Sequence, residues 1–165
     1  MKTRHPLIRL LTLALVLCLM LSAAPLALAA RKSVELAASA YPVEENGFYD
    51  TMEEVAVYLW RFGGLPSNFV TKREAEALGW SNRRGNLWEV APGCAIGGDH
   101  FGNYEGLLPD KKGRRWTECD IDFDGGYRGA KRLIYSNDGL MYYTDDHYES
   151  FTRIVVVEGE QPSKR

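Results

Sequence analysis

The chain has 165 residues, of which 45% are hydrophobic and 25% are charged, and its formal net charge is -2 at pH 7. This composition is typical of a folded globular protein, and it excludes a disordered chain, a collagen-like repeat and a disulfide-dense scaffold. Because the total charge is negative, any anionic partner has to bind at a local basic patch.

The first 29 residues have the layout of a secretory signal peptide. Three basic residues precede the apolar run 10–21, and the stretch ends in the small-residue site Ala27-Leu28-Ala29. The alternative is a membrane anchor, but the small residues and the lack of a charged stop-transfer flank favour cleavage. We therefore expect a secreted, extracellular protein that has no membrane contact after cleavage and a net charge of -5, because three basic and no acidic residues are removed.

Cleavage would leave Cys94 and Cys119 as the remaining cysteines. In an oxidising compartment such a pair favours one disulfide, although sequence does not establish the bridge. Two thiols 25 residues apart fit no metal-binding pattern, and no histidine cluster accompanies them. We expect neither a metal ion nor another cofactor.

The rest of the chain is predicted to contain one domain. Residues 30–47 show no sustained periodicity, which predicts a pro-segment or a flexible lead-in. The domain is expected over residues 48–157, and residues 158–165 form a short polar tail. A single domain of this size is large enough to bury one hydrophobic core.

Helices are predicted in the first half of the domain. Asp50 and Glu53 have the spacing of a capping box, and so do Thr71 and Glu74. Apolar residues at helical spacing follow each of these motifs, and glycines end both patterns. The predicted helices cover residues 51–62, 72–78 and 86–90.

The second half alternates apolar and polar residues with a period of two, which predicts strands. The turn Asn137-Asp138-Gly139 is a strong hairpin signal, since Asp-Gly tolerates the positive φ of a tight turn. Helices followed by a meander of strands indicate an α+β domain. The predicted strands lie near residues 95–101, 115–122, 130–136, 140–144 and 151–155.

Glu118 and His147 are the residues best suited to proton transfer. Alternation along the strand near residues 115–122 places Glu118 on the face opposite the apolar set, so that it faces outward. It is either a solvated strand carboxylate or a general base. His147 lies in a polar loop, where an imidazole can hold or release a proton near neutral pH.

Cations gather in two places despite the acidic total. Lys72 and Arg73 lie in the first turn of a predicted helix, where the helix dipole disfavours cations unless an anion such as phosphate compensates. Seven more fall between Lys111 and Arg132, and Arg128 and Arg132 lie on either side of the start of a strand. The pattern indicates a phosphate-binding surface, with solvated basic loops as the alternative.

The segment 101–106, Phe-Gly-Asn-Tyr-Glu-Gly, combines aromatic rings, a flexible backbone and one acid. It could stack a base and accept hydrogen bonds from its edge, as in readers of single-stranded RNA, or it could be a plain glycine-rich turn.

Six motifs in register then resemble one family. They are LPSNFVTK at 65–72, ALGW at 77–80, GNL at 85–87, VAPG at 90–93, IGGD at 96–99 and TDDHYESF at 144–151. Together they resemble the barnase-like, guanyl-preferring ribonucleases of bacteria, a branch of the microbial ribonuclease family. The resemblance extends without an evident gap from about Thr51 to Val155.

The resemblance implies N-terminal helices packed on a five-stranded antiparallel sheet. It also implies that Glu118 is the general base and His147 the general acid. The other matching positions are the phosphate-binding cations Lys72, Arg128 and Arg132, the guanine-recognition loop with Phe101, Asn103 and Glu105, and the aromatic Tyr148 beside the histidine.

The activity implied is cleavage of single-stranded RNA after guanosine without a metal. The ribose 2'-OH attacks the adjacent phosphate to give a 2',3'-cyclic phosphate, which is then hydrolysed, and DNA is therefore not expected to react. We also expect a monomer, and a barstar-like inhibitor inside the producing cell. The alternatives are a glycosidase, which needs two suitably spaced carboxylic acids, and a secreted RNA-binding module without turnover.

The chain departs from the family at three points. Tyr104 stands where the family carries an arginine that contacts RNA and the inhibitor, and Gly102 replaces a serine of the recognition loop. Cys94 and Cys119 are not family features.

Overall fold

Five consecutive strands in the second half of the chain form an antiparallel meander in this computed structural model, which describes residues 32–159. The strands lie within two or three residues of their predicted positions. They are β3 (Ala95–Phe101), β4 (Trp116–Asp120), β5 (Arg132–Ser136), β6 (Met141–Thr144) and β7 (Thr152–Val157). The signal-peptide prediction and most of the predicted tail lie outside the described residues.

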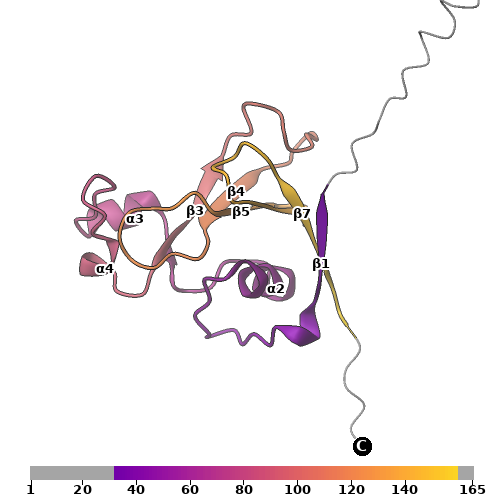
Figure 1. Cartoon of the computed structure of the whole chain (residues 1–165), viewed down its shortest axis with the longest axis horizontal. Coiled ribbons are helices and arrows are strands. Elements are labelled where there is room, and N and C mark those ends of the chain that lie inside the picture. The colour runs from indigo at the N-terminus through magenta and orange to yellow at the C-terminus, as the bar shows by residue number, and fades with distance from the viewer. Residues whose placement is uncertain (1–31, 160–165) are drawn as a thin grey trace, which may run out of the picture. The chain divides into compact units, whose positions relative to one another are not determined.

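The sheet is larger than the expected five-stranded antiparallel one, and that expectation is wrong in two respects. It has seven strands in the order β1-β7-β6-β5-β4-β3-β2, and both outer strands are parallel to their neighbours. Strand β1 (Ser33–Ala37) runs along β7, as Figure 1 shows, and β2 (Phe69–Val70) runs along β3. The central meander satisfies the predicted pattern, and each extra strand covers one of its edges.

The N-terminal segment differs from the flexible lead-in expected over residues 30–47. Strand β1 pairs over its whole length with residues 153–157, and a short 3-10 helix, η1 (Ala38–Ala40), follows it. Leu36 and Val43 are buried, and this apolar burial holds the segment against the domain. Whether residues 30–47 are later removed as a pro-segment stays a prediction.

Three α-helices form within one residue of their predicted ranges. They are α2 (Met52–Phe62), α3 (Lys72–Ala77) and α4 (Leu87–Val90). The first begins one residue later than the Asp50 box implies, because the Thr51 hydroxyl accepts the hydrogen bond from the backbone N–H of Glu54. The predicted box of Thr71 and Glu74 before α3 is present in both directions.

Both faces of the sheet are covered. Helix α2 packs Val55, Ala56 and Leu59 on one face, against residues that include Leu133 and Met141 (Figure 1). A separate cluster covers the other face and contains Leu108, Trp116, Ile134 and Tyr142. Glu118 lies on the same side of β4 as Trp116, so the face predicted to be outward is in fact enclosed by loops.

Within residues 32–159, no helix has the length and hydrophobicity needed to cross a membrane.

Candidate active site

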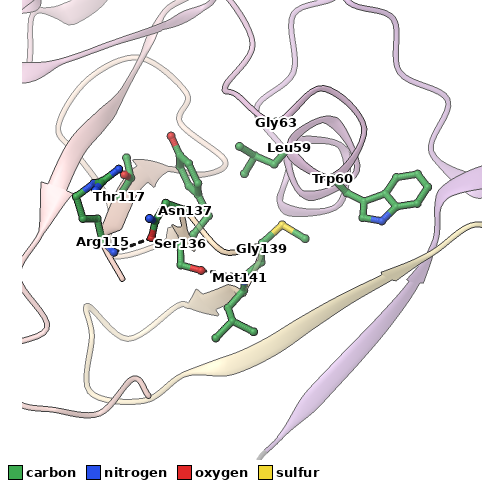
Figure 2. A pocket seen from close by; sticks show the side chains of 11 residues that line it. Leu59, Trp60, Gly63, Arg115, Thr117, Ser136, Asn137, Gly139 and Met141 are labelled. Carbon is green, nitrogen blue, oxygen red and sulfur yellow. Dashed lines mark hydrogen bonds between the residues drawn. The ribbon is translucent and has the colours of Figure 1, made fainter. Parts of the chain in front are cut away.

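Two hollows on the domain differ in their chemistry. The first, of about 450 Å³, lies between the end of α2 and the strands β4 to β6, and Figure 2 shows Leu59, Thr117 and Met141 among its lining residues. None of the described residues that line it carries a carboxylate or an imidazole. This hollow therefore offers no acid–base pair.

The second hollow, of about 530 Å³, brings together most of the residues singled out from the sequence. It contains a carboxylate and an imidazole, together with the predicted recognition loop. Its lining consists of His100, Phe101, Gly102, Asn103, Tyr104, Glu105, Leu107, Glu118, His147, Tyr148 and Glu149. These residues come from β3, β4 and two loops, so only the folded sheet assembles them.

Glu118 is a buried, fully paired carboxylate at the base of this hollow. It is 7% exposed. Its Oε1 accepts from Lys72 Nζ at 2.7 Å, and its Oε2 accepts from the hydroxyl of Tyr148 at 2.7 Å. Burial by itself raises the pKa of Glu118, but these two hydrogen bonds and the nearby cations outweigh it and hold the pKa below its usual value. Glu118 is therefore ionised at neutral pH.

Lys72 reaches Glu118 from the first position of α3. The sequence predicts an anion near the charge of Lys72. In the structure the anions beside it are carboxylates of the chain itself. Asp99 accepts from the Lys72 backbone N–H at 2.9 Å, and Glu118 binds the ammonium group. An irregularity in the pairing of β3 between Gly97 and Asp99 accompanies this contact. The Lys72 side chain is still 38% exposed and can be reached by a ligand.

Arg128 and Arg132 share one buried carboxylate, that of Asp120. Arg128 donates two hydrogen bonds to it, at 2.6 and 2.7 Å, and Arg132 Nε lies 3.0 Å from Oδ1. Burial lowers the pKa of Arg128, but the Asp120 contact reverses this and raises the pKa above its usual value. Arg132 also donates to the hydroxyl of Tyr148 at 3.1 Å, which links the arginines to Glu118.

The two arginines differ in how much of them a ligand can reach. The Arg128 side chain is 14% exposed, whereas that of Arg132 is 3% exposed. Arg132 is also held by the carbonyls of Gly129 and Lys131. The structure thus puts Lys72 and Arg128 at the surface of the site and Arg132 behind them.

His147 is exposed at the rim of the hollow, on a strained loop. His147 and Tyr148 both have positive φ, 58° and 76°, which is unusual for residues other than glycine. Asp146 fixes this loop by accepting hydrogen bonds from Thr144 Oγ1, the backbone N–H of Ser150 and its hydroxyl, at 2.6–3.0 Å. These bonds, those from Ser150 first, lower the pKa of Asp146 to about 2.

The predicted recognition loop is closed by Asn103. Its side chain donates to the carbonyl of Leu108 and accepts from the Leu108 backbone N–H, both at 3.0 Å. Asn103 is therefore a structural residue of the loop, as its φ of 47° also indicates. Phe101 stacks on Tyr148 with ring centroids 5.4 Å apart, and Glu105 lies exposed at the loop end.

Cys94 and Cys119 are both free, so the structure does not contain the disulfide that was expected. Cys119 is buried among residues under α2, and burial raises the pKa of its thiol well above the usual value. Cys94 packs instead against the separate cluster around α3 and α4.

The basic residues that precede β4, Lys111, Lys112, Arg114 and Arg115, do not line the second hollow. Arg114 and Lys111 bind Asp138 in the hairpin between β5 and β6, with Arg114 at 2.7 Å and Lys111 at 3.5 Å. Lys111 and Arg114 therefore stabilise a turn. Sequence reasoning missed the site carboxylates Asp99, Asp120 and Asp146, although the first and last of these lie inside motifs that it quoted.

Comparison with known proteins agrees with this geometry. A family model described as ribonuclease matches residues 54–155. A protein named "Ribonuclease" from Bacillus intermedius is 55% identical over 105 residues, which cover 64% of this chain and 65% of that protein. The chain thus spans just under two thirds of the length of that relative.

Two further relatives cover different parts of the match. One named "Ribonuclease" from Heyndrickxia coagulans is 54% identical over 105 residues, which cover 64% of this chain and 96% of that protein. One named "Guanyl-specific ribonuclease St" from Saccharopolyspora erythraea is 40% identical over 60 residues, which cover 36% of this chain and 59% of that protein.

Proposed function

This chain belongs to the ribonuclease family, and we propose that it is a secreted endoribonuclease that cleaves single-stranded RNA, preferentially after guanosine. The relatives named ribonuclease support the activity, and the one named guanyl-specific supports the base preference. The signal-type sequence of the first 29 residues supports secretion. We also propose that the protein acts as a monomer and that a barstar-like inhibitor protects the producing cell.

The proposed reaction is a transesterification at phosphorus. Glu118 takes the proton of the ribose 2'-OH, whose oxygen forms a bond to phosphorus, and the bond from phosphorus to the 5'-oxygen breaks. His147, as imidazolium, gives its proton to the departing 5'-oxygen. Hydrolysis of the cyclic phosphate reverses the roles: His147 takes a proton from water, the water oxygen forms a bond to phosphorus, the bond from phosphorus to the 2'-oxygen breaks, and Glu118 gives its proton to that oxygen.

Lys72 connects phosphate binding to the strength of the base. In the free protein its ammonium group lies 2.7 Å from Glu118, which lowers the proton affinity of the carboxylate. A bound phosphate attracts Lys72 and weakens the contact of Lys72 with Glu118. The proton affinity of Glu118 then rises again toward its usual value. Arg128 binds the phosphate beside it, and Arg132 supports Tyr148 and Asp120 from behind.

One observation carries the proposal: the fold places a buried, ionised carboxylate and an exposed imidazole in one hollow that is bordered by cations. A glycosidase would need a second catalytic carboxylic acid in place of the imidazole. The arrangement instead has a base, an acid and charges suited to a phosphodiester.

The test uses residues 30–165 and an RNA oligonucleotide with one internal guanosine, in buffer with EDTA. Mass spectrometry of the products should show cleavage after guanosine with a 2',3'-cyclic phosphate end. Cleavage at every base would overturn the guanine preference but keep the mechanism. A folded protein that binds this RNA without cutting it would replace the proposal with an RNA-binding module.

Glu118→Gln keeps the size of the side chain and removes the base, so we expect kcat/KM to fall by about 10²- to 10⁴-fold. The matched control is Glu35→Gln, which changes an exposed glutamate on β1. Near-normal cleavage by the Glu118 variant would refute its role as the base.

A further inference from the structure

The loop that carries Arg128 has no regular structure of its own. It joins β4 to β5 over residues 121–131, and its ends are tied by a hydrogen bond of 3.3 Å from the backbone N–H of Ile121 to the carbonyl of Lys131. Between these ends, within the described part of the chain, no backbone N–H of residues 123–130 donates to a backbone carbonyl. Other contacts therefore hold the middle of the loop.

Trp88 of α4 makes the first of these contacts. A Cβ atom built on Gly125 would overlap with ring atoms Cε3 and Cδ2 of Trp88, so the ring lies directly on the backbone of the loop, which passes beside α4 in Figure 1. Gly125 also has a φ of 83°, in the left-handed region that favours glycine. The ring and the backbone conformation thus both require a glycine at this position.

The Trp88 ring is fixed in place although 41% of the residue is exposed. Its Nε1–H donates to the carbonyl of Cys94 at 2.9 Å, and Phe123 packs edge-on against it with ring centroids 5.8 Å apart. Phe123 belongs to the buried cluster around α3 and α4. Trp88 therefore joins the loop to a rigid part of the domain.

A second contact lies one residue further along the loop. Gly85, which precedes α4, has a φ of 59°. A Cβ atom at Gly85 would lie 2.9 Å from the carbonyl carbon of Gly126 and 3.0 Å from the backbone nitrogen of Tyr127. The two backbones therefore meet with no side chain between them, and both contacts lie within three residues of Arg128.

The bonds of Arg128 do not fix the loop by themselves. Its guanidinium group donates twice to Asp120, but a long, flexible side chain separates that group from the backbone, so the same bonds are compatible with several backbone positions. Only 14% of the side chain is exposed, and this part has to reach a phosphate while the bonds to Asp120 are kept. Where the loop is held therefore decides what Arg128 can reach.

We propose that Trp88 is a positioning residue of the phosphate-binding site. Its contact with Gly125 and the contact of Gly85 with Gly126 form a clamp, which holds the loop so that the exposed part of Arg128 faces the bound phosphate. Trp88 itself does not touch the phosphate. The inference rests on the proposed function, because that function assigns phosphate binding to Arg128.

The test measures binding of inorganic phosphate to residues 30–165 by NMR titration at constant ionic strength, which requires no cleavage of RNA. Arg128→Ala should weaken binding roughly tenfold, as expected for the loss of one charge-assisted contact. Trp88→Ala should weaken it by about three- to tenfold in the original protein and by less than about twofold in the Arg128→Ala background. The Nε–H signal of Arg128 should shift on addition of phosphate, and it should shift less in the Trp88 variant.

A second variant acts on the other half of the clamp. Gly85→Ala places a methyl group between the two backbones and should weaken phosphate binding in the same direction as Trp88→Ala. The matched control is Trp60→Ala, since Trp60 is 42% exposed on α2 and lines the other hollow. Its phosphate binding should equal that of the original protein.

Equal weakening by Trp88→Ala in both backgrounds would overturn the clamp, because the loss would then not act through Arg128. Unchanged binding in either clamp variant, or no phosphate binding by the original protein, would also overturn it. Phosphate binding that depends on Trp88 through Arg128, in a protein that does not cleave RNA, would support the clamp while the proposed function fails. Cleavage of RNA with phosphate binding that is independent of Trp88 would have the opposite meaning.

Discussion

Asp146 fixes the loop that carries His147, the proposed general acid, without lining the hollow itself. Two successive residues with left-handed backbone are costly, by about 1–3 kcal/mol each, and persist only where neighbouring contacts hold them. The bonds from Thr144 and Ser150 to Asp146 are such contacts, and they lie on both sides of His147. The position of the proposed general acid thus depends on a carboxylate that has no part in the proposed proton transfer.

We expect Asp146→Asn to lower kcat by between about 10- and 100-fold with little change in KM, because the loop then holds His147 less well. Steady-state kinetics on a guanosine dinucleotide would measure this. Asp145→Asn is the control, because it removes the neighbouring carboxylate. Asp145 is exposed and makes no side-chain hydrogen bond to the described part of the chain. If both variants lost activity equally, local charge and not loop geometry would be the cause.

We expect Tyr148 to affect the acidic limb of the pH profile of kcat/KM, where activity falls as Glu118 becomes protonated. Its hydroxyl donates to Glu118 and helps to hold the pKa of that carboxylate below the usual value, while burial and this same bond raise the pKa of Tyr148 to about 12. A base with a lowered pKa stays deprotonated to lower pH. Activity should therefore persist below the pH at which an ordinary glutamate becomes protonated.

Tyr148→Phe removes this donor, so we expect the acidic limb of kcat/KM to move to higher pH. The measurement is the pH dependence of kcat/KM between about pH 3 and 7 for the variant and the original protein. Tyr143→Phe, on the face of the sheet covered by α2, should leave the limb in place. An unmoved limb in the Tyr148 variant would show that the Tyr148 hydroxyl does not lower the pKa of Glu118.

Among the elements, β1 is the one that adds most to the expected fold. Leu36 and Ile154 belong to the same buried cluster, so the N-terminal strand contributes to the main core although it precedes the region matched by the family model. Leu36 is 5% exposed, and its burial stabilises the fold by about 2 kcal/mol. The strand lies beyond β7 at the edge of the sheet opposite β2, away from the hollow.

We expect Leu36→Ala to lower the free energy of unfolding by about 2–4 kcal/mol and to leave kcat/KM unchanged. Urea denaturation followed by circular dichroism would measure the difference. Glu35→Ala, an exposed neighbour on the same strand, should change stability by less than about 0.5 kcal/mol. A Leu36 variant as stable as the control would mean that β1 is loosely attached.

The meander was predictable because five segments alternate with a period of two and a strong turn signal joins two of them. Strand β1 was missed because only Val34 and Leu36 carry its alternation, and its pairing depends on β7, more than a hundred residues later. Asp50 was taken as the helix cap because Asp50–Glu53 and Thr51–Glu54 have the same spacing.

In the site, residue types were predictable but partners were not. The sequence marks Glu118 as an alternating strand residue, which by itself implies exposure, and only the covering loops bury it. Asp120 looks like another outward residue of the same strand, whereas it is 2% exposed and binds two arginines. Such pairing depends on elements far apart in the chain, so local patterns do not contain it.

At the scale of the whole molecule, few cations of the candidate site are exposed enough to contact a phosphate. After removal of the signal the net charge would be -5, and of the site cations only Lys72 and Arg128 are exposed enough to meet a phosphate. We therefore expect long-range attraction to RNA to be weak and binding of RNA to depend on short-range contacts.

We expect log(kcat/KM) to fall with log[salt] with a slope of only about -0.7 to -1.4 between about 50 and 300 mM, as for one or two phosphate contacts on a single strand. Initial rates on a short oligonucleotide at several salt concentrations would give the slope. Lys72→Gln, measured on the residual activity, should reduce the slope by roughly 0.7. A slope much steeper than -2 would show that cations outside the site bind the RNA.

The pairing of β1 with β7 also has a consequence for synthesis. The two strands are the first and the last of the sheet in chain order, and they lie side by side. A ribosome completes β1 long before it reaches residue 152. Strand β1 therefore has no pairing partner until β7 has been synthesised. A product that ends before β7 leaves β1 without its neighbour, and the order of the strands thereby distinguishes a finished chain from an unfinished one.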